Sequence, residues 1–158
     1  MGQMSMSAET RLKELKITLP EPPRPVATYD PAVRSGNLLF ISGQLPLVEG
    51  RLHKVGKLGG QFSLEEGQEA ARRATLNALA IAKHSLGSLD QVSRVVRLSV
   101  HVASAAGFTD QPRVANGASE LLISIFGDAG RHARLALGAA ELPLGAPVEI
   151  ELILEVKG

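Results

Sequence analysis

The sequence predicts an α+β domain in which two helices cover one face of a mixed sheet. Residues 64–86 carry Ala, Leu and Ile at helical spacing behind a capping pattern, and residues 92–102 alternate as in a strand with one buried face. Shorter apolar runs bounded by Gly and Pro lie before the first of these helices and near the end of the chain. The resulting order, β-β-α-β-α-β-β, requires parallel crossovers through the helices, flanked by hairpins.

Length and composition indicate one ordinary globular domain. The chain has 158 residues, of which 44% are hydrophobic, and its net charge of +1 provides no basic surface for nucleic acid or an anionic membrane. Aromatic residues make up 3%, too few for base stacking, and the apolar runs are shorter than the roughly 20 residues that span a bilayer. The absence of cysteine excludes disulfides and thiolate chemistry. We therefore expect a cytoplasmic protein with neither nucleic-acid nor membrane partners.

The N-terminus is predicted to be an extension of the domain. Residues 7–15 fit a short capped helix with Leu12 and Leu15 facing inward. Residues 19–25 contain four prolines, which fix the backbone and remove donors, so this segment should run extended over the surface. We divide the chain into an extension, residues 1–25, and a domain, residues 26–158.

The domain should begin with a pair of strands. Residues 37–43 form a strand punctuated by Gly36 and Gly43, apolar enough to be buried on both faces. A second strand is expected at residues 52–55, paired with the first through a turn at residues 48–50.

Two helices follow, with a strand between them. The first, residues 64–86, begins at the Ser63–Glu66 capping box and stops at Gly87, and the second covers residues 110–126. The intervening strand, residues 92–102, is predicted to bury one parity: Val92, Val96, Leu98, Val100 and Val102.

The face of the sheet away from the helices should promote self-association. Its outward positions, such as Ser42, Ser99 and Ala139, are small or apolar. A sheet face of this kind needs cover, which a second copy of the chain can supply. We therefore expect a homo-oligomer.

The last two strand-like runs contain the most informative charge of the chain. Arg134 interrupts the small, apolar run at residues 130–140, and Glu149 lies in the run at residues 147–155, close to where a hairpin partner of Arg134 would be. An isolated guanidinium is too costly in low dielectric, so Arg134 is either half of an internal ion pair or the anchor of an anion site. The pattern alone favours the ion pair, and it leaves Glu149 balanced between a solvated strand face and a site.

Other candidate groups have weaker signals. The four histidines lack metal-ligand spacing, and no phosphate-binding glycine motif occurs, so we expect neither a metal nor a cofactor. His132 fits a supporting or surface role better than that of a base. Tyr29 fits a loop ring packed on the core, and Asn116, unfavourable inside a helix, offers its amide to a neighbouring strand or subunit.

Taken together, several segments resemble the RidA/YjgF (reactive intermediate deaminase) family, also called endoribonuclease L-PSP. The resemblance covers about residues 26 to 156 and is carried by residues 29–33, 36–46, 114–116, 133–134, 142–146 and 148–151. The motifs Asn-Gly-Ala-Ser at residues 116–119 and Gly-Arg-His-Ala-Arg at residues 130–134 mark a distinct branch.

The resemblance implies a chorismate-mutase-like fold and a homotrimer with three clefts between subunits. Archetypal members hydrolyse enamines and imines, such as 2-aminoacrylate, to a 2-keto acid and ammonia. By this resemblance Arg134 grips the substrate carboxylate, Glu149 orients the attacking water, Tyr29 lines the cleft and Asn116 lies near it.

Three departures from the family pattern leave alternatives open. Leu135 and Ala136 stand where many members carry small hydroxyl or thiol residues, Ser119 replaces a common tyrosine, and the loop at residues 48–61 is longer than usual. The first hypothesis is a 2-imino acid deaminase. The alternative is a non-catalytic trimer that binds a small carboxylate or a partner protein, and the sparse basic and aromatic residues disfavour a ribonuclease.

Overall fold

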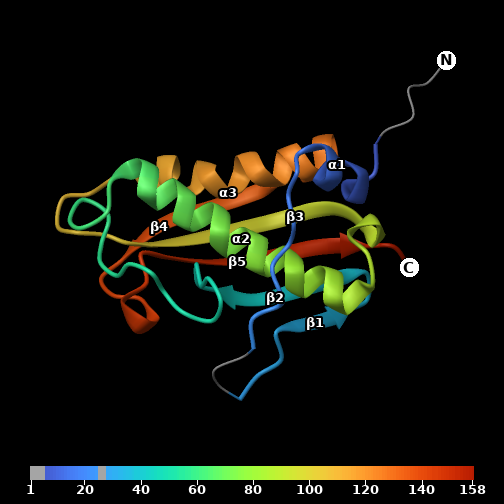
Figure 1. Ribbon diagram of the computed structural model, residues 1–158, viewed down its shortest axis with the longest axis horizontal. Coiled ribbons are helices and arrows are strands. Elements are labelled where there is room, and N and C mark those ends of the chain that lie inside the picture. The colour runs from blue at the N-terminus through green and yellow to red at the C-terminus, as the bar shows by residue number, and fades with distance from the viewer. Residues whose placement is uncertain (1–5, 25–27) are drawn as a thin grey trace.

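The computed structural model describes residues 6–24 and 28–158, and it contains one five-stranded mixed sheet in the order β1-β2-β5-β3-β4 (Figure 1). The strands are β1 (Ala32–Ser35), β2 (Leu38–Gln44), β3 (Val92–Ala103), β4 (Ala133–Ala139) and β5 (Val148–Val156). The helices are α1 (Ala8–Glu14), α2 (Leu64–Leu86) and α3 (Gln111–Phe126), with short 3-10 turns η1 (Leu89–Gln91), η2 (Gly127–Gly130) and η3 (Pro143–Gly145). The predicted α+β class is confirmed.

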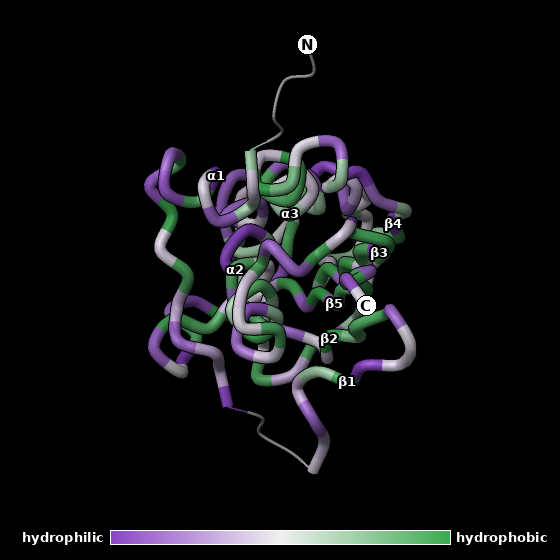
Figure 2. The backbone as a smooth tube through the Cα atoms, turned by 90° about the vertical axis from the view of Figure 1, so that its right-hand side faces the viewer, coloured by the Kyte–Doolittle hydropathy of each residue, from purple (hydrophilic) through white to green (hydrophobic). Residues whose placement is uncertain are grey.

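The layers are arranged as the sequence predicts. Figure 2 shows α2 and α3 together on one side of the sheet. Strand β5, at the centre of the sheet, buries alternate residues beneath the helices, namely Val148, Ile150, Leu152, Leu154 and Val156. This period of two is the pattern of a strand with one face on the core.

Helix α2 follows directly from its sequence signals. The Ser63 hydroxyl accepts from the Glu66 amide at 3.1 Å, and the Glu66 carboxylate accepts from the Ser63 amide at 3.0 Å, which completes the capping box. Gly87 ends the helix with a φ of 85°, a left-handed conformation that glycine adopts without strain.

A close approach of backbones fixes the distance between α2 and α3. A Cβ atom added at Gly117 of α3 would overlap the backbone carbonyl of Gln68 in α2. The Gln68 side chain also donates a 2.8 Å hydrogen bond to the carbonyl oxygen of Arg113. The two helices therefore interlock at a position that admits no side chain.

The first hairpin differs from the prediction. Strand β2 is present, but it pairs antiparallel with β1 through the Gly36-Asn37 turn, and residues 52–55 form no strand. The predicted turn at residues 48–50 is present and is closed by two backbone hydrogen bonds between Val48 and Arg51, but the pairing extends no further than this single bridge.

The strand faces also need two corrections. Strand β2 is not buried on both faces, because Phe40 is 40% exposed on the side away from the helices. In β3 the register shifts between Val95 and Arg97, so Val95 is fully buried and the predicted Val96 is only half-buried. The irregularity reverses the parity of residues on its two sides.

The last two strands do not form a hairpin. Strand β4 pairs parallel with β3 at the edge of the sheet, and β5 pairs antiparallel with β3 on its other side. Because β3 lies between them, Arg134 and Glu149 are not cross-strand neighbours. Strand β4 is also mostly exposed in the single chain, rather than buried as its apolar sequence suggests.

The N-terminal helix is present and packs on the domain. Leu12 is 4% exposed as predicted, whereas Leu15 is 46% exposed because α1 has ended before it. The Glu9 carboxylate accepts from the Leu89 amide and pairs with Lys83, both at 3.0 Å. The chain then crosses α2 in extended form (Figure 1). The predicted boundary between residues 25 and 26 adjoins residues that the structure does not describe, and it stays a prediction.

Replacement of Gly117 by Ala tests the contact between α2 and α3. In an open helix this change is stabilising, but here the new Cβ must push the Gln68 carbonyl away, so we expect the free energy of unfolding to fall by about 1–3 kcal/mol. Urea denaturation measures the change. Ser124→Ala, an exposed position on the same helix, is the control and should stay within about 0.5 kcal/mol of the wild type. A stabilised Gly117→Ala variant would contradict the contact.

Candidate functional site

Arg134 points toward helix α3. Its position on β4 pairs with Leu98, whose side chain is buried under the helices, so both residues face the helical layer. The Nη1 atom donates to the side-chain oxygen of Asn116 at 2.8 Å and to the Ser119 hydroxyl at 3.2 Å. Residues that sequence analysis singled out separately, Arg134 and Asn116, are therefore in direct contact.

These two bonds leave one edge of the guanidinium available. Each η-nitrogen carries two hydrogens, so the bonds to Asn116 and Ser119 use both hydrogens of Nη1. Within the described chain, Nε and Nη2 of Arg134 donate to no acceptor. Together they form a planar edge of two parallel N–H donors, the geometry that binds a carboxylate in bidentate fashion.

His132 extends this polar cluster. Its Nε2 atom lies 2.9 Å from the Ser119 hydroxyl, and its Nδ1 atom lies 2.6 Å from the Gly130 carbonyl oxygen. Sequence analysis treated Ser119 only as a departure from the family pattern and gave His132 a supporting or surface role. Ser119 and His132 are thirteen residues apart in the sequence, and the fold of α3 and η2 brings them together. No local sequence pattern predicts this contact.

Glu149 lies on the opposite face of the sheet. In the register of β3 and β5, Glu149 is the cross-strand neighbour of His101, and it is half-buried. Its Cδ atom lies 3.1 Å from the point where a Cβ atom at Gly43 would sit. Burial raises the pKa of Glu149, the nearby His101 lowers it, and Glu151 raises it further, with a net upward shift. The carboxylate is thus held in an environment that favours its protonated form.

Arg134 and Glu149 do not form the ion pair that the sequence pattern favoured. The ion pairs among the described residues do not include either side chain. The two residues lie two strands apart and three positions out of register, so their Cα atoms are about 14 Å apart on standard sheet spacing, with side chains on opposite faces. A small molecule cannot contact both within one chain.

Tyr29 lies far from Arg134 as well. It is 45% exposed just before β1, while Arg134 is on β4, and these strands are the two edges of the sheet. One chain therefore brings Arg134 and Asn116 together and leaves Tyr29 and Glu149 elsewhere.

The uncovered face of the sheet is partly apolar. Four large hydrophobic side chains are exposed on the sheet, namely Val33 (51%), Phe40 (40%), Leu135 (39%) and Leu137 (37%). Between them lies Ser99, which is only 4% exposed. Ser99, one of the three outward residues cited from the sequence, is therefore already covered by its neighbours within the single chain.

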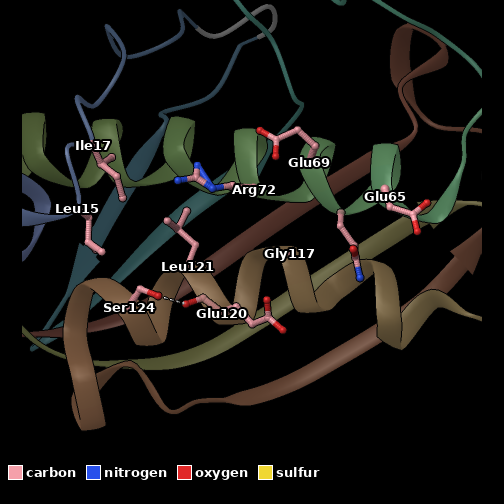
Figure 3. A pocket seen from close by; sticks show the side chains of 10 residues that line it. Leu15, Ile17, Glu65, Glu69, Arg72, Gly117, Glu120, Leu121 and Ser124 are labelled. Atoms are coloured by element: carbon pink, nitrogen blue, oxygen red, sulfur yellow. Dashed lines mark hydrogen bonds between the residues drawn. The ribbon is translucent and has the colours of Figure 1, made fainter.

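A hollow lies on the helical side of the sheet (Figure 3). It has a volume of about 380 Å³ between α2 and α3, where Arg72 lies among the carboxylates Glu65, Glu69 and Glu120. None of the candidate residues Tyr29, Asn116, Arg134 and Glu149 lines it. In the described part of the chain, no three His, Cys, Asp or Glu side chains cluster as metal ligands would.

Comparison with known proteins identifies the family. Residues 9–156 match the family model described as "YjgF/chorismate_mutase-like, putative endoribonuclease". The chain belongs to this family, which confirms the resemblance and the chorismate-mutase-like fold. No helix in the described residues has the length and hydrophobicity to cross a membrane.

Three relatives cover nearly the whole chain. Protein TCP17 of Trypanosoma cruzi is 45% identical over 92% of this chain and 91% of its own length. The crystal structure of Atu1372 from Agrobacterium tumefaciens, a protein of unknown function, is 44% identical with a TM-score of 0.87, over 95% of this chain and 92% of that one. The 2-iminobutanoate/2-iminopropanoate deaminase of Dermatophagoides farinae is 29% identical over 89% of this chain and 95% of its own length.

The raised pKa of Glu149 predicts a stability that depends on pH. A carboxyl whose pKa is higher in the folded chain than its ordinary value of 4.5 weakens folding as pH rises through that higher pKa. The Glu149→Gln variant should therefore have the higher free energy of unfolding at pH 7, and the difference should vanish below pH 4.5. Urea denaturation at both pH values and one protein concentration measures it.

The control for this experiment is Glu155→Gln on the same strand. Glu155 is exposed, so its replacement should change the free energy of unfolding by less than about 0.5 kcal/mol at either pH. An advantage of Glu149→Gln that grows as the pH falls would contradict the direction of the shift.

Proposed function

We propose that this member of the YjgF family is a deaminase that hydrolyses small 2-imino acids to 2-keto acids and ammonia. The observation that carries the proposal is the geometry of Arg134, whose Nη1 is held by Asn116 and Ser119 while Nε and Nη2 present two parallel donors. This edge matches the carboxylate that every 2-imino acid bears beside its reactive carbon.

The reaction needs little beyond orientation and one proton acceptor. Water adds to the imine carbon while a base takes one water proton and returns it to the imine nitrogen, which gives a carbinolamine. Transfer of the hydroxyl proton to the same nitrogen then breaks the C–N bond, releases ammonia and leaves the keto group. Arg134 fixes the carboxylate, and through it the adjacent carbon. A raised pKa makes the Glu149 carboxylate a stronger base for the water proton than an ordinary glutamate.

The site requires more than one chain. Glu149 faces away from Arg134, and Tyr29 lies at the other edge of the sheet, so both can reach the substrate only from a second copy. A cyclic arrangement sets one edge of each sheet beside the other edge of its neighbour, which completes a site at every interface. The family resemblance gives the number of copies as three, and the cell compartment as the cytoplasm.

Relatives support this reading in part. The Dermatophagoides relative is named as a deaminase of 2-iminobutanoate and 2-iminopropanoate, two small 2-imino acids. The more similar TCP17 carries no activity in its name. The proposal of a specific reaction therefore rests on the geometry of Arg134 together with a relative of 29% identity.

A second candidate function is carboxylate binding without turnover. It is favoured by Leu135 and Ala136, which follow Arg134 on the strand and add no group that can exchange a proton. Under this alternative Arg134 recognises a metabolite, and Glu149 plays no chemical part.

The Arg134→Ala variant tests the proposed function. Loss of a charge-assisted contact with the carboxylate should lower kcat/KM for 2-iminobutanoate, generated in the assay by an amino-acid oxidase, by roughly 10- to 100-fold. The kcat/KM of Arg134→Lys should lie between those of the wild type and Arg134→Ala, because lysine keeps the charge without the planar fork. Arg131→Ala, three residues away and 71% exposed in its side chain, is the matched control and should retain activity.

Two outcomes would decide against the deaminase. Equal background rates for wild type and Arg134→Ala would contradict both the enzyme and the role of its anchor. Saturable binding of 2-oxobutanoate by the wild type, lost in Arg134→Ala but without any hydrolysis, would support the binding protein instead.

A charge on the open face tests the assembly. Leu137→Glu places a carboxylate among the exposed apolar residues, and we expect the mass in sedimentation equilibrium to fall from about three times 16.7 kDa to a single chain. Deaminase activity should fall with it. Leu15→Glu, at a leucine of similar exposure on the helical side, should leave the mass unchanged. A monomeric wild type with full activity would refute the shared site.

A further inference from the structure

We propose that Ser119 and His132 are positioning residues that lock the guanidinium of Arg134 with its Nε and Nη2 edge outward. The proposal rests on the proposed function only in naming the ligand of that edge as a carboxylate. The evidence for the lock is a continuous chain of hydrogen bonds from Arg134 through Ser119 and His132 to the backbone at Gly130.

Chemistry determines the direction of each hydrogen bond in this chain for the neutral form of the His132 imidazole. A guanidinium only donates, so the Ser119 oxygen accepts from Arg134. A backbone carbonyl only accepts, so His132 carries a proton on Nδ1 and donates it to Gly130. A neutral imidazole then has a lone pair on Nε2, which accepts the hydroxyl proton of Ser119.

His132 supplies what Ser119 alone lacks. A serine hydroxyl rotates freely, and its proton can turn toward any nearby acceptor. When that proton is bonded to Nε2 of His132, a lone pair of the oxygen stays directed at Nη1 of Arg134. The histidine thereby sets the orientation of a group it does not itself touch.

The far end of the chain is anchored in rigid backbone. Gly130 is buried, and a Cβ atom there would overlap the carbonyl of Leu122 in α3. The backbone at Gly130 therefore packs directly against the helix that also carries Asn116 and Ser119. A functional group supported on all sides by fixed elements keeps its geometry before the ligand arrives.

The lock accounts for one departure from the family pattern and for one of the motifs that mark the branch. Sequence analysis noted that Ser119 occupies the position of a common tyrosine and that the segment Gly130–Arg134 marks a branch. The structure joins both into one cluster on the helical side of β4. We infer that this chain orients its arginine with a Ser-His pair.

The first test needs no ligand and no variant. In the wild type, ¹⁵N NMR of the imidazole should show His132 as the Nδ1-protonated tautomer, which is the minor form of free histidine in water. The four η-protons of Arg134 should exchange slowly with one another, because the bonds to Asn116 and Ser119 hinder rotation of the guanidinium. An Nε2-protonated ring would overturn the proposal.

Matched variants isolate the acceptor at Nε2. His132→Gln places an amide oxygen near the position of Nε2, whereas His132→Asn reaches only the position of Nδ1. We expect His132→Asn and Ser119→Ala to accelerate rotation of the Arg134 guanidinium several-fold, and His132→Gln to retain the slow rate. His84→Asn, at an exposed histidine on α2, is the control. Equal rotation rates in all folded variants would refute the lock.

Kinetics then separate positioning from mere stability. An anchor that holds substrate and transition state alike should, when loosened, raise KM by roughly 3- to 10-fold and leave kcat nearly unchanged. We expect KM to rise in His132→Asn and Ser119→Ala, and to stay close to the wild-type value in His132→Gln. A wild type without turnover or keto-acid binding would refute the proposed function, and the NMR result would still decide the lock.

Discussion

The parallel pairing of β4 with β3 determines where every candidate group lies. Strand β4 follows helix α3 and pairs parallel with β3 at the edge of the sheet, with alternate side chains directed toward that helix. Arg134 has the parity that faces α3, so its guanidinium meets Asn116 and Ser119. Were β4 instead a hairpin partner of β5, Arg134 would lie beside Glu149 and the anion site would be an internal ion pair.

Local sequence signals predicted the long helices and strands, but they could not predict which strands pair with one another. The capping box and glycine stop of α2 and the apolar period of β5 are properties of short windows, and both elements are present. Strand β1 is four residues long and mostly exposed, so it carries no buried pattern that could reveal it. The partner of β4 is set by packing of α3 over the sheet, a contact between distant residues that no window contains.

The sequence could nominate the residues of the candidate site, but it could not predict how they are distributed over the sheet. Arg134 and Asn116 were each identified as misfits, one as a charge in an apolar run and the other as a poor helix former, and the structure explains both by their mutual bond. Their companions Ser119 and His132 are unremarkable in sequence. The placement of Tyr29 and Glu149 depends on which strands form the edges, and that in turn depends on the pairing of β4.

Assembly and chemistry are coupled through the open face of the sheet. Glu149 is already half-buried there in a single chain, and exposed apolar residues such as Phe40 and Leu137 surround that face. In the proposed assembly, a second copy docked on this face removes more water from Glu149, and this desolvation adds to the upward shift of its pKa and makes its carboxylate a better base. Removing water from the Glu149 carboxylate also costs free energy and opposes docking, so the contact between apolar side chains must outweigh this cost. Under the proposed function, the interface that completes the site therefore also activates Glu149.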